Sequence, residues 1–510
     1  MSKMNEVLGK IANQTYTKNG AVTNKSTRSA VLDLFAAGGA SRNMEQSTLI
    51  DLIYNAIQED FILTMKCLFY FRDIRHGLGE RKVFNIAMDY LINSGYGSQI
   101  APILSIIPEF GRWDDLIKLM DYGDGYVNAI IGDLVLNQLL EDEKLEYPSL
   151  LAKWMPSENT SSKETRIMAY RLITWLYMPP REYRRRVVAL RKKIDIIENK
   201  LRIKDYLSID YSKIPSQAGF KYKKAFLRND YERYSQFIQD AASGKVKVNA
   251  STLYPYQIVR EIISNHLHYS KYSNYSEHLK NQYQALWDNL LNYSTGDKNY
   301  LVVADVSGSM EDNGGLPMAV SVSMAIYMAQ RNQGTFKNKY MTFSARPNII
   351  EINENANILD LVYDVMHTGV GYNTDIVAVY DLLLRIMVQN NLPQSELPDK
   401  IILISDMEFD RANVGRYNRT PIGTIFDKIQ EVYNQYGYNM PSTVFWNVNA
   451  SGNNFPMTKN DAGMQLVSGC SPTIFETITK GEYLDPYNFM VNVLNDERYD
   501  VVEKLLNNPV

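Results

Sequence analysis

The chain has 510 residues, a formal net charge of −3 and an ordinary globular composition, with 45% hydrophobic and 22% charged residues. This length exceeds the roughly 250–300 residues at which a single core stops growing, so we expect two or more domains. The composition excludes collagen-like, mucin-like and largely disordered chains. The near-neutral charge by itself neither favours nor excludes a nucleic-acid partner.

The first residues and the cysteine content bear on where the protein works. The segment MSKMNEVLGKIANQTYTKNG lacks the apolar core of a signal peptide, and no later run reaches the roughly 18 apolar residues of a membrane span. The two cysteines, Cys67 and Cys470, offer neither a disulfide framework nor a CxxC metal site. We therefore expect a cytoplasmic protein without a membrane partner.

Residues 28–296 read as amphipathic helices joined by short turns, after an N-terminal arm of residues 1–27. Apolar residues recur there at helical spacing, as in Leu49, Leu52 and Ile53. Because strand-like alternation is scarce, we expect an all-α, solenoid-like domain of stacked, HEAT-like helix pairs. No fixed repeat period is visible, so the expected repeats are irregular.

Beyond the polar segment 293–299 the pattern changes, and residues 297–510 read as a separate domain. Short apolar runs alternate there with amphipathic helices, which is typical of an α/β domain with a mostly parallel, Rossmann-like sheet. The expected element order is β-α-β-β-α-α-β-α-β-β-α. We expect the strands to end near residues 305, 343, 351, 406, 448 and 469.

The sequence DVSGSM follows the first of these strands and contains the DxSxS pattern of Asp305, Ser307 and Ser309. Two hydroxyls two residues apart on a turn can point to one side, with the Asp305 carboxylate beneath them. Thr374, in GVGYNTD, and Asp406, at the end of IILISD, are expected at the same edge of the sheet. This set of oxygen ligands predicts a Mg²⁺ site, and Mn²⁺ accepts the same ligands.

The alternative interpretation is that these residues serve only the local turns. Asp305 and Ser307 would then cap the following helix, and Asp406 would begin a turn. A lone DxSxS pattern is weak support for a metal site, because Asp and Ser are common in turns. The coincidence of all five positions near strand ends favours the metal site.

Residues 181–233 hold 16 Lys and Arg against 7 Asp and Glu, and this excess indicates an anionic partner. Basic helices can neutralise nucleic-acid phosphates, and Tyr222, Tyr231 and Tyr234 are available to stack on bases. The candidate RNA-binding residues of this stretch are Arg184, Arg185, Arg186, Arg191, Lys192, Lys193, Lys221, Lys223, Lys224 and Arg228.

Other interpretations of these charges stay open. A basic stripe is often only the solvated face of a helix, opposite a buried side that here would include Val187, Val188 and Leu190. A second charged cluster lies upstream, and its alternating signs favour ion pairs between helices over a functional role. That cluster consists of Arg72, Asp73, Arg75, Glu80 and Arg81.

The five candidate metal ligands match the metal-ion-dependent adhesion site of von Willebrand factor A domains, and the resemblance covers about residues 299–485. In that family the serines and the threonine contact the metal, and the aspartates act directly or through water. A partner's acidic residue often fills the open coordination position. One departure is that Tyr372 and Asn373 separate Gly371 from Thr374, which leaves the shape of this loop open.

Several strings of the helical part are distinctive, among them FRDIRHGLGERKVF, IPEFGRWDDLIKL and IDYSKIPSQAGFKYKKAFLRND. With the A domain, they resemble a family from plants, fungi and large phages that is distantly similar to the Ro autoantigen and TROVE proteins. TROVE proteins hold RNA ends in a ring of helical repeats and bind small structured RNAs on its outer surface. The resemblance implies a TROVE-like helical domain with structured or misfolded RNA as the partner. It also implies two further candidate RNA-binding residues from these strings, Arg112 and Lys213.

We therefore expect a non-enzymatic RNA-binding protein whose A domain provides a metal-dependent docking site for an acidic residue. The alternative is a metal-dependent protein scaffold that binds no RNA. A metal-dependent phosphoesterase is disfavoured, because neutral hydroxyl ligands keep the cation electrophilic and suit it to capture an external anion. The sequence also lacks the GxxxxGK[ST] and GxSxG patterns, and none of its five histidines has a zinc-ligand partner at the usual spacing.

Overall fold

The computed structural model divides by its contacts into two compact units. Unit 1 comprises Met1–Thr48 and Tyr206–Val493, and unit 2 comprises Leu49–Asp205 and Leu494–Val510. The domain boundaries near residues 27 and 296 stay a prediction, and residues 294–298 lie outside the described part of the chain. The structure describes Met4, Leu8 and residues 12–194, 196–250, 253–266, 276–293, 299–368, 374–409, 422–450, 454–480 and 485–508.

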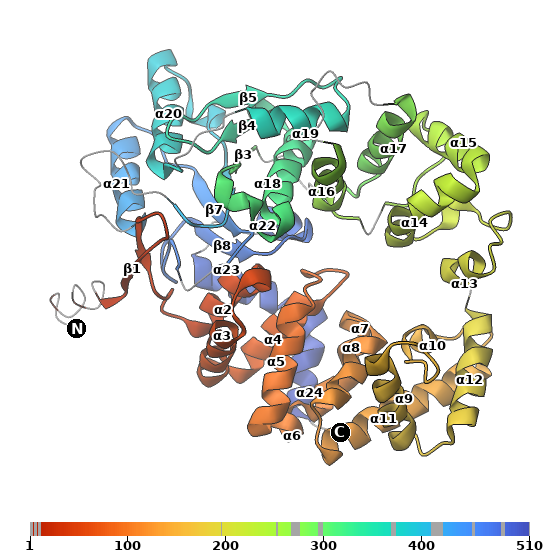
Figure 1. Cartoon of the computed structure of the whole chain (residues 1–510). Coiled ribbons are helices and arrows are strands. Elements are labelled where there is room, and N and C mark those ends of the chain that lie inside the picture. Colours follow the sequence, from red (N-terminus) through yellow and green to blue (C-terminus); the bar gives the residue numbers. More distant parts are fainter. Residues whose placement is uncertain are drawn as a thin grey trace. The chain divides into compact units, whose positions relative to one another are not determined.

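Unit 1 is built, in its described part, around a six-stranded sheet in the order β5-β4-β3-β6-β7-β8 (Figure 1). β4 and β5 are antiparallel, and the other neighbouring strands are parallel. Each strand ends within one residue of its expected end, which confirms the predicted α/β sheet. The sequence pattern did not predict the antiparallel β4–β5 pair. The strands are β3 (Tyr300–Ala304), β4 (Lys339–Thr342), β5 (Ile349–Glu351), β6 (Lys400–Ser405), β7 (Ser442–Asn447) and β8 (Met464–Ser468).

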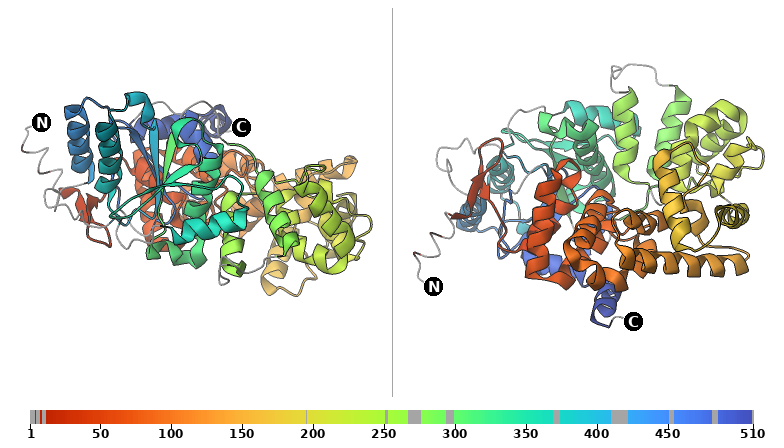
Figure 2. Two further views of the ribbon diagram at one scale, coloured as in Figure 1. Left: turned by 90° about the horizontal axis from the view of Figure 1, so that it is seen from above. Right: turned by 60° about the horizontal axis from the view of Figure 1, so that its bottom comes forward.

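Helices cover both faces of this sheet, which is why β3 and β6 are buried along their whole length (Figure 2). On one face, Phe475 of α22 packs edge-on against Tyr300 of β3, with the ring centres 5.5 Å apart. On the other, Phe426 of α21 packs against Phe445 of β7 at 5.6 Å. The ends of the central strands are thereby held in a rigid frame.

The helices of unit 1 follow the predicted order along the α/β part. α23 ends at Leu494, the first residue of the C-terminal segment of unit 2. The helices are α2 (Ala30–Gly38), α14 (Ser216–Asn229), α15 (Tyr231–Ala242), α16 (Pro255–His266), α17 (Glu277–Asp288), α18 (Asp312–Arg331), α19 (Ile358–His367), α20 (Ile376–Asn390), α21 (Ile422–Gln435), α22 (Thr473–Lys480) and α23 (Pro486–Leu494).

The N-terminal residues are part of unit 1 and pack against its sheet. β1 (Gln14–Tyr16) and β2 (Val22–Asn24) form an antiparallel pair, and Asn24 continues it through a bridge to Phe455. The Ser468 hydroxyl, at the end of β8, donates to the Phe35 carbonyl of α2 at 2.7 Å. This hairpin was not expected, because three-residue strands give no periodic pattern.

Unit 2 is helical throughout its described part, which confirms the predicted helical region; a solenoid of repeats stays a prediction. α3 begins in unit 1 and continues into unit 2. The helices are α3 (Gln46–Glu59), α4 (Phe61–Arg72), α5 (Lys82–Leu91), α6 (Gly97–Ile100), α7 (Ile107–Phe110), α8 (Trp113–Lys118), α9 (Gly125–Lys144), α10 (Leu151–Trp154), α11 (Lys163–Trp175), α12 (Pro180–Lys193), α13 (Ile197–Arg202) and α24 (Asp500–Asn507).

Ion pairs connect these helices in the interior of unit 2. The fully buried Asp115 carboxylate accepts from Arg72 Nε at 2.9 Å and from Arg81 Nε at 2.5 Å. Asp73 pairs with Arg498, just before α24, and so joins the two chain segments of the unit. Three members of the charged cluster predicted upstream, Arg72, Asp73 and Arg81, therefore form ion pairs between helices, as its alternating signs indicated. Arg75 instead donates to the Glu109 carbonyl at 2.7 Å.

Candidate functional site

The predicted metal ligands lie at the carboxyl edge of the sheet in unit 1. β3 and β6 are adjacent and parallel, with Ala304 opposite Ile404. Asp305 follows β3 directly, and Asp406 follows β6. Since parallel neighbours end at the same edge, the two carboxylates come from crossover loops that diverge at this point, where open α/β sheets bind their ligands.

Hydrogen bonds connect four of the five predicted residues into one cluster. The Asp305 carboxylate accepts from the Ser307 backbone N–H at 2.9 Å, and the Ser307 and Ser309 hydroxyls lie 3.2 Å apart. The Ser309 hydroxyl also bonds to Asp406 and helps to hold its negative charge. The structure thus brings together Asp305, both serines and Asp406, although they span a hundred positions.

Ser405 belongs to the same cluster and was missed in the sequence. Its hydroxyl donates to Asp305 Oδ2 at 2.7 Å and accepts from the Met407 backbone N–H at 3.2 Å. It therefore ties the end of β6 to the Asp305 carboxylate. The signal was a polar residue closing the otherwise apolar run IILIS, directly before Asp406.

Burial makes the two carboxylates costly to ionise. Burial raises the pKa of Asp305 to about 6, with a smaller rise from the charge of Asp406, while hydrogen bonds from Ser307 and Ser405 lower it. Burial also raises the pKa of Asp406, against the lowering effect of hydrogen bonds from the Glu408 N–H and the Ser309 hydroxyl. A divalent cation between them would offset the repulsion and favour both charged forms.

The oxygen atoms of this cluster suit a hard cation such as Mg²⁺ only if the serine hydroxyls are counted as ligands. Among the described residues, no group of three or more His, Cys, Asp or Glu side chains is placed to hold a metal ion. The two carboxylates and the Ser307 and Ser309 hydroxyls, in contrast, are the oxygen donors that Mg²⁺ and Mn²⁺ accept. The side chains of this cluster therefore fit a cation that is held by hydroxyl oxygens as well as by carboxylates.

Thr374 is buried directly before Asp375, which caps α20 by accepting from the Val377 and Ala378 N–H groups. Its neighbours in the predicted glycine-rich loop, residues 369–373, lie outside the described residues. The place of Thr374 in the site, and the loop shape affected by Tyr372 and Asn373, stay predictions.

The loop that leaves the site is fixed by an unusual backbone turn. Asn313, Gly314 and Gly315 all have positive φ angles of 56–71° at the start of α18, so the regular helix begins after them. Arg260 of α16 donates from Nη2 to the Asn313 carbonyl at 3.0 Å and from Nε to the Gly314 carbonyl at 3.2 Å. Glycine at two of these positions relieves the steric cost of the left-handed conformation.

The N-terminal hairpin contacts the same edge of the sheet. Thr17 Oγ1 donates to the Phe409 carbonyl at 2.7 Å, and Asn19 Nδ2 donates to the Glu408 carbonyl at 2.7 Å. The Lys18 backbone N–H donates to the Glu408 carboxylate at 2.6 Å. Sequence reasoning missed these residues, because nothing local shows that the first 20 residues bind a loop almost 400 positions later.

The predicted basic region divides into cations with structural partners and cations without them. Arg191 of α12 uses its guanidinium on the Ala152 and Met155 carbonyls, at 2.7 and 2.6 Å. Arg186 pairs with Glu182 at 2.8 Å. Lys193 donates to the last carbonyls of α9, Arg184 pairs with Glu158, and Arg112 stacks over the Trp154 ring at 4.9 Å.

Three expectations about this region need correction. Lys223 was expected on the RNA-binding face, but it is 5% exposed, paired with Glu261, and its pKa is lowered by burial. Tyr234 is only 6% exposed and cannot stack on a base. Val188 was expected to be buried but is 45% exposed, because the core side of α12 is formed by Tyr183, Val187 and Leu190.

Four further basic candidates lie in unit 1 and are exposed, namely Lys213 and, on α14, Lys221, Lys224 and Arg228. Lys221 lies over the Tyr222 ring at 4.9 Å, and Lys213 pairs with Asp210 at 3.4 Å.

One face of α12 combines exposure with unpaired positive charge. Arg181, Arg185 and Lys192 have no ion-pair partner among the described residues, and they recur at spacings of four and seven along the helix. They line a surface cavity of about 930 Å³ together with Val188, Ala189, Pro179, Glu182 and Arg184. Arg181 begins the basic stretch but was not among the candidate RNA-binding residues, and its spacing of four residues from Arg185 was the available signal.

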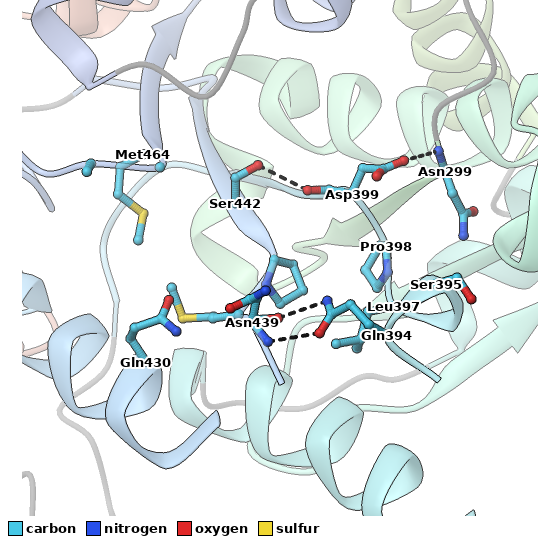
Figure 3. Close-up of a pocket in the computed structure, with 14 residues that line it drawn as sticks. Asn299, Gln394, Ser395, Leu397, Pro398, Asp399, Gln430, Asn439, Ser442 and Met464 are labelled. Atoms are coloured by element: carbon cyan, nitrogen blue, oxygen red, sulfur yellow. Dashed lines mark hydrogen bonds between the residues drawn. The ribbon is translucent and has the colours of Figure 1, made fainter. Parts of the chain in front are cut away.

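A second cavity, of about 490 Å³, lies at the opposite edge of the sheet, where the central strands begin (Figure 3). The Asp399 carboxylate accepts from the Asn299 N–H at 2.8 Å, and Gln394 exchanges two hydrogen bonds with the Asn439 main chain. These polar groups are hydrogen-bonded to one another, and the bonds connect the loops that line the cavity. None of the predicted site residues lines this cavity.

No helix in the described part of the chain has the length and apolar content to cross a bilayer. This finding agrees with the sequence, in which no apolar run is long enough.

Comparisons with known proteins add relatives to this description. Residues 299–508 match a domain of unknown function, DUF7788. An uncharacterized protein of Acanthamoeba polyphaga mimivirus is 27% identical over 523 residues, covering 95% of this chain and 88% of that protein. The crystal structure of the Ro (RSR) protein of Deinococcus radiodurans aligns over 92% of this chain and 96% of that chain, with 12% identity. Its TM-score is 0.34, and at that score the likeness carries no argument about this chain.

A second family match lies in the N-terminal part. Residues 17–103 and 126–294 match a domain of unknown function, DUF2828, and these residues make up just over half of the chain. The match includes the hairpin segment from Thr17 onward, most of the helical residues of unit 2, and α2 and α14 to α17 of unit 1. The chain therefore belongs to the DUF2828 family.

Proposed function

We propose that residues 297–510 form a von Willebrand A-type domain that binds a divalent cation, Mg²⁺ or Mn²⁺, and docks an acidic group of a partner on it. The observation that carries this proposal is the cluster of Asp305, Ser307, Ser309 and Asp406 at the ends of two adjacent parallel strands. When bound, the cation would supply a Lewis-acidic position for an external carboxylate. The protein would act by binding, without turnover.

Titration of the full-length chain with Mg²⁺ alone tests this proposal. We expect calorimetry to detect a single site per chain that EDTA reverses. The absence of any saturable site at millimolar Mg²⁺ and Mn²⁺ would refute it.

We further propose that the exposed face of α12 binds RNA. A helix face that carries Arg181, Arg185 and Lys192 without ion-pair partners can neutralise phosphates and release their counterions. Tyr177 lies just before Pro179 of the cavity and is 83% exposed, so it is available to stack on a base. We also propose a reducing, cytoplasmic location, which agrees with the two buried cysteines, Cys67 and Cys470.

Reversing the three unpaired charges of this face should weaken RNA binding. For Arg181→Glu/Arg185→Glu/Lys192→Glu, we expect the affinity for a structured RNA to fall about tenfold or more near 0.1 M salt. Fewer phosphate contacts should also reduce the salt dependence of binding. A filter-binding titration at several salt concentrations measures both effects.

The matched control makes the same change in net charge elsewhere in unit 2. Lys118→Glu/Lys144→Glu/Lys163→Glu alters three exposed lysines and should leave the RNA affinity within about twofold of wild type. Equal losses in both triple variants would mean that only net charge matters. No RNA binding by the wild-type protein would favour the second candidate function, a metal-dependent protein scaffold without RNA.

A further inference from the structure

The turn between β1 and β2 is attached to the loop that follows β6. Thr17, Lys18 and Asn19 each donate a hydrogen bond to Glu408 or Phe409, at 2.6–2.7 Å. Two of these bonds come from side chains and one from the backbone, so the turn is held at three successive positions. The position of this turn relative to Asp406 is therefore fixed by direct contacts within unit 1.

Glu408 is the residue that connects the turn to the candidate metal site. It is 5% exposed, and its carboxylate accepts from the Lys18 N–H at 2.6 Å and from Asn454 Nδ2 at 3.1 Å. Its own N–H donates to Asp406 Oδ1 at 3.1 Å. The same residue thus orients the Asp406 carboxylate and anchors the N-terminal turn, which places both at one edge of the sheet.

The Lys18 side chain is exposed and makes no hydrogen bond or ion pair with the described residues. Its backbone is fixed two hydrogen bonds away from Asp406, through Glu408. Its positive charge acts on Asp406, where it lowers the carboxylate pKa against the larger effect of burial. A positive charge that acts on Asp406 also repels a cation bound beside Asp406, and it attracts an anion that approaches that cation.

We propose that Lys18 is a specificity-determining residue of the docking site, whose ammonium contacts the carboxylate of an acidic peptide segment bound at the cation. This inference rests on the proposed cation site and identifies the partner chemistry as acidic peptide. The N-terminal turn is then one wall of the site, and its attachment to Glu408 keeps the ammonium beside the ligand. The positive charge of Lys18 therefore favours the binding of anionic ligands over neutral ones.

The test uses the full-length chain, Mg²⁺ alone and a fluorescent hexaglutamate peptide. For Lys18→Gln we expect peptide affinity in Mg²⁺ to fall about fivefold and Mg²⁺ affinity to rise about twofold, because one lost positive charge acts with opposite sign on the two ligands. Lys18→Arg should keep wild-type values. Both effects should shrink in 0.5 M salt, where exposed charges are screened.

Lys25→Gln is the matched control, because it removes an exposed lysine just beyond the same hairpin without contact to Glu408. It should change neither affinity. Parallel losses of peptide and Mg²⁺ affinity in Lys18→Gln would indicate a merely structural role and overturn the inference. It would also be overturned by unchanged peptide binding in this variant, or by wild-type protein that binds Mg²⁺ but not hexaglutamate. Absence of Mg²⁺ binding by wild type would instead remove the proposed cation site itself.

Discussion

Replacing Asp305 by Asn should lower the affinity for Mg²⁺ by about 100-fold or more, since even residues that only support a metal ligand contribute 10–100-fold. Asn keeps the shape of Asp and can still accept from the Ser307 N–H, and the Ser405 hydroxyl can reverse its direction. The loss of Mg²⁺ affinity would therefore result from the missing negative charge and not from a change of shape. Calorimetric titration measures it, and Asp312→Asn, on an exposed carboxylate of the following turn, is the control.

The same substitution should have the opposite effect on the stability of the metal-free protein. The folded state raises the pKa of Asp305 to about 6, above the roughly 3.9 of an unfolded chain. Between these two pKa values the folded state binds more protons than the unfolded state. The free energy of unfolding therefore falls as the pH rises from about 4 to 6. At pH 7 the buried charge costs roughly 3 kcal/mol, at about 1.4 kcal/mol per pKa unit, which Asn would recover.

Urea unfolding in EDTA at pH 5 and pH 7 checks this sign. We expect Asp305→Asn to be more stable than wild type at pH 7, with a smaller difference at pH 5. Added Mg²⁺ should stabilise the wild type and have little effect on the variant. A variant that is less stable than wild type in EDTA would show that the carboxylate serves the fold and would favour the turn interpretation.

Asp115→Ala should destabilise unit 2 by about 3–5 kcal/mol, because it leaves a buried cation without its partner. Arg72 is 2% exposed and donates two hydrogen bonds to this carboxylate. The change also removes the acceptor of Arg81 and of the Arg112 N–H. Urea unfolding followed by circular dichroism measures the loss.

Asp121→Ala is the control for this prediction, since Asp121 pairs with Arg171 at the surface and is 44% exposed. Its expected cost is below about 1 kcal/mol. Replacing both Arg72 and Asp115 by Met and Leu should cost less than Asp115→Ala alone, because no buried charge is then unpaired. A small effect of Asp115→Ala, equal to that of Asp121→Ala, would contradict the role assigned to this ion pair.

Much of the α/β part could be predicted because its signals are local. β3 is an apolar run and β6 is apolar from Ile401 to Ile404, and an Asp follows each strand. The same pattern therefore predicted both the carboxylates and the edge of the sheet at which they lie. Ser307 and Ser309 followed from their spacing to Asp305. Parallel pairing then brings these positions together without further information.

The rest depends on contacts between distant parts of the chain. Lys18 and Glu408, or Asp73 and Arg498, show no relation in the sequence, although each pair is in direct contact. The charge excess of the basic region likewise does not show which cations face the interior. Lys223 is buried and paired with Glu261, 38 residues along the chain, and only the fold shows that it is not on the surface.

A crystal structure grown with Mn²⁺ tests the central claim most directly, because the anomalous signal locates the ion. We predict one peak within about 2–2.5 Å of the Ser307 and Ser309 hydroxyls, next to the Asp305 and Asp406 carboxylates, with Thr374 at or near the coordination shell. A fully occupied Mn²⁺ ion elsewhere in the chain, with no peak between β3 and β6, would contradict the account.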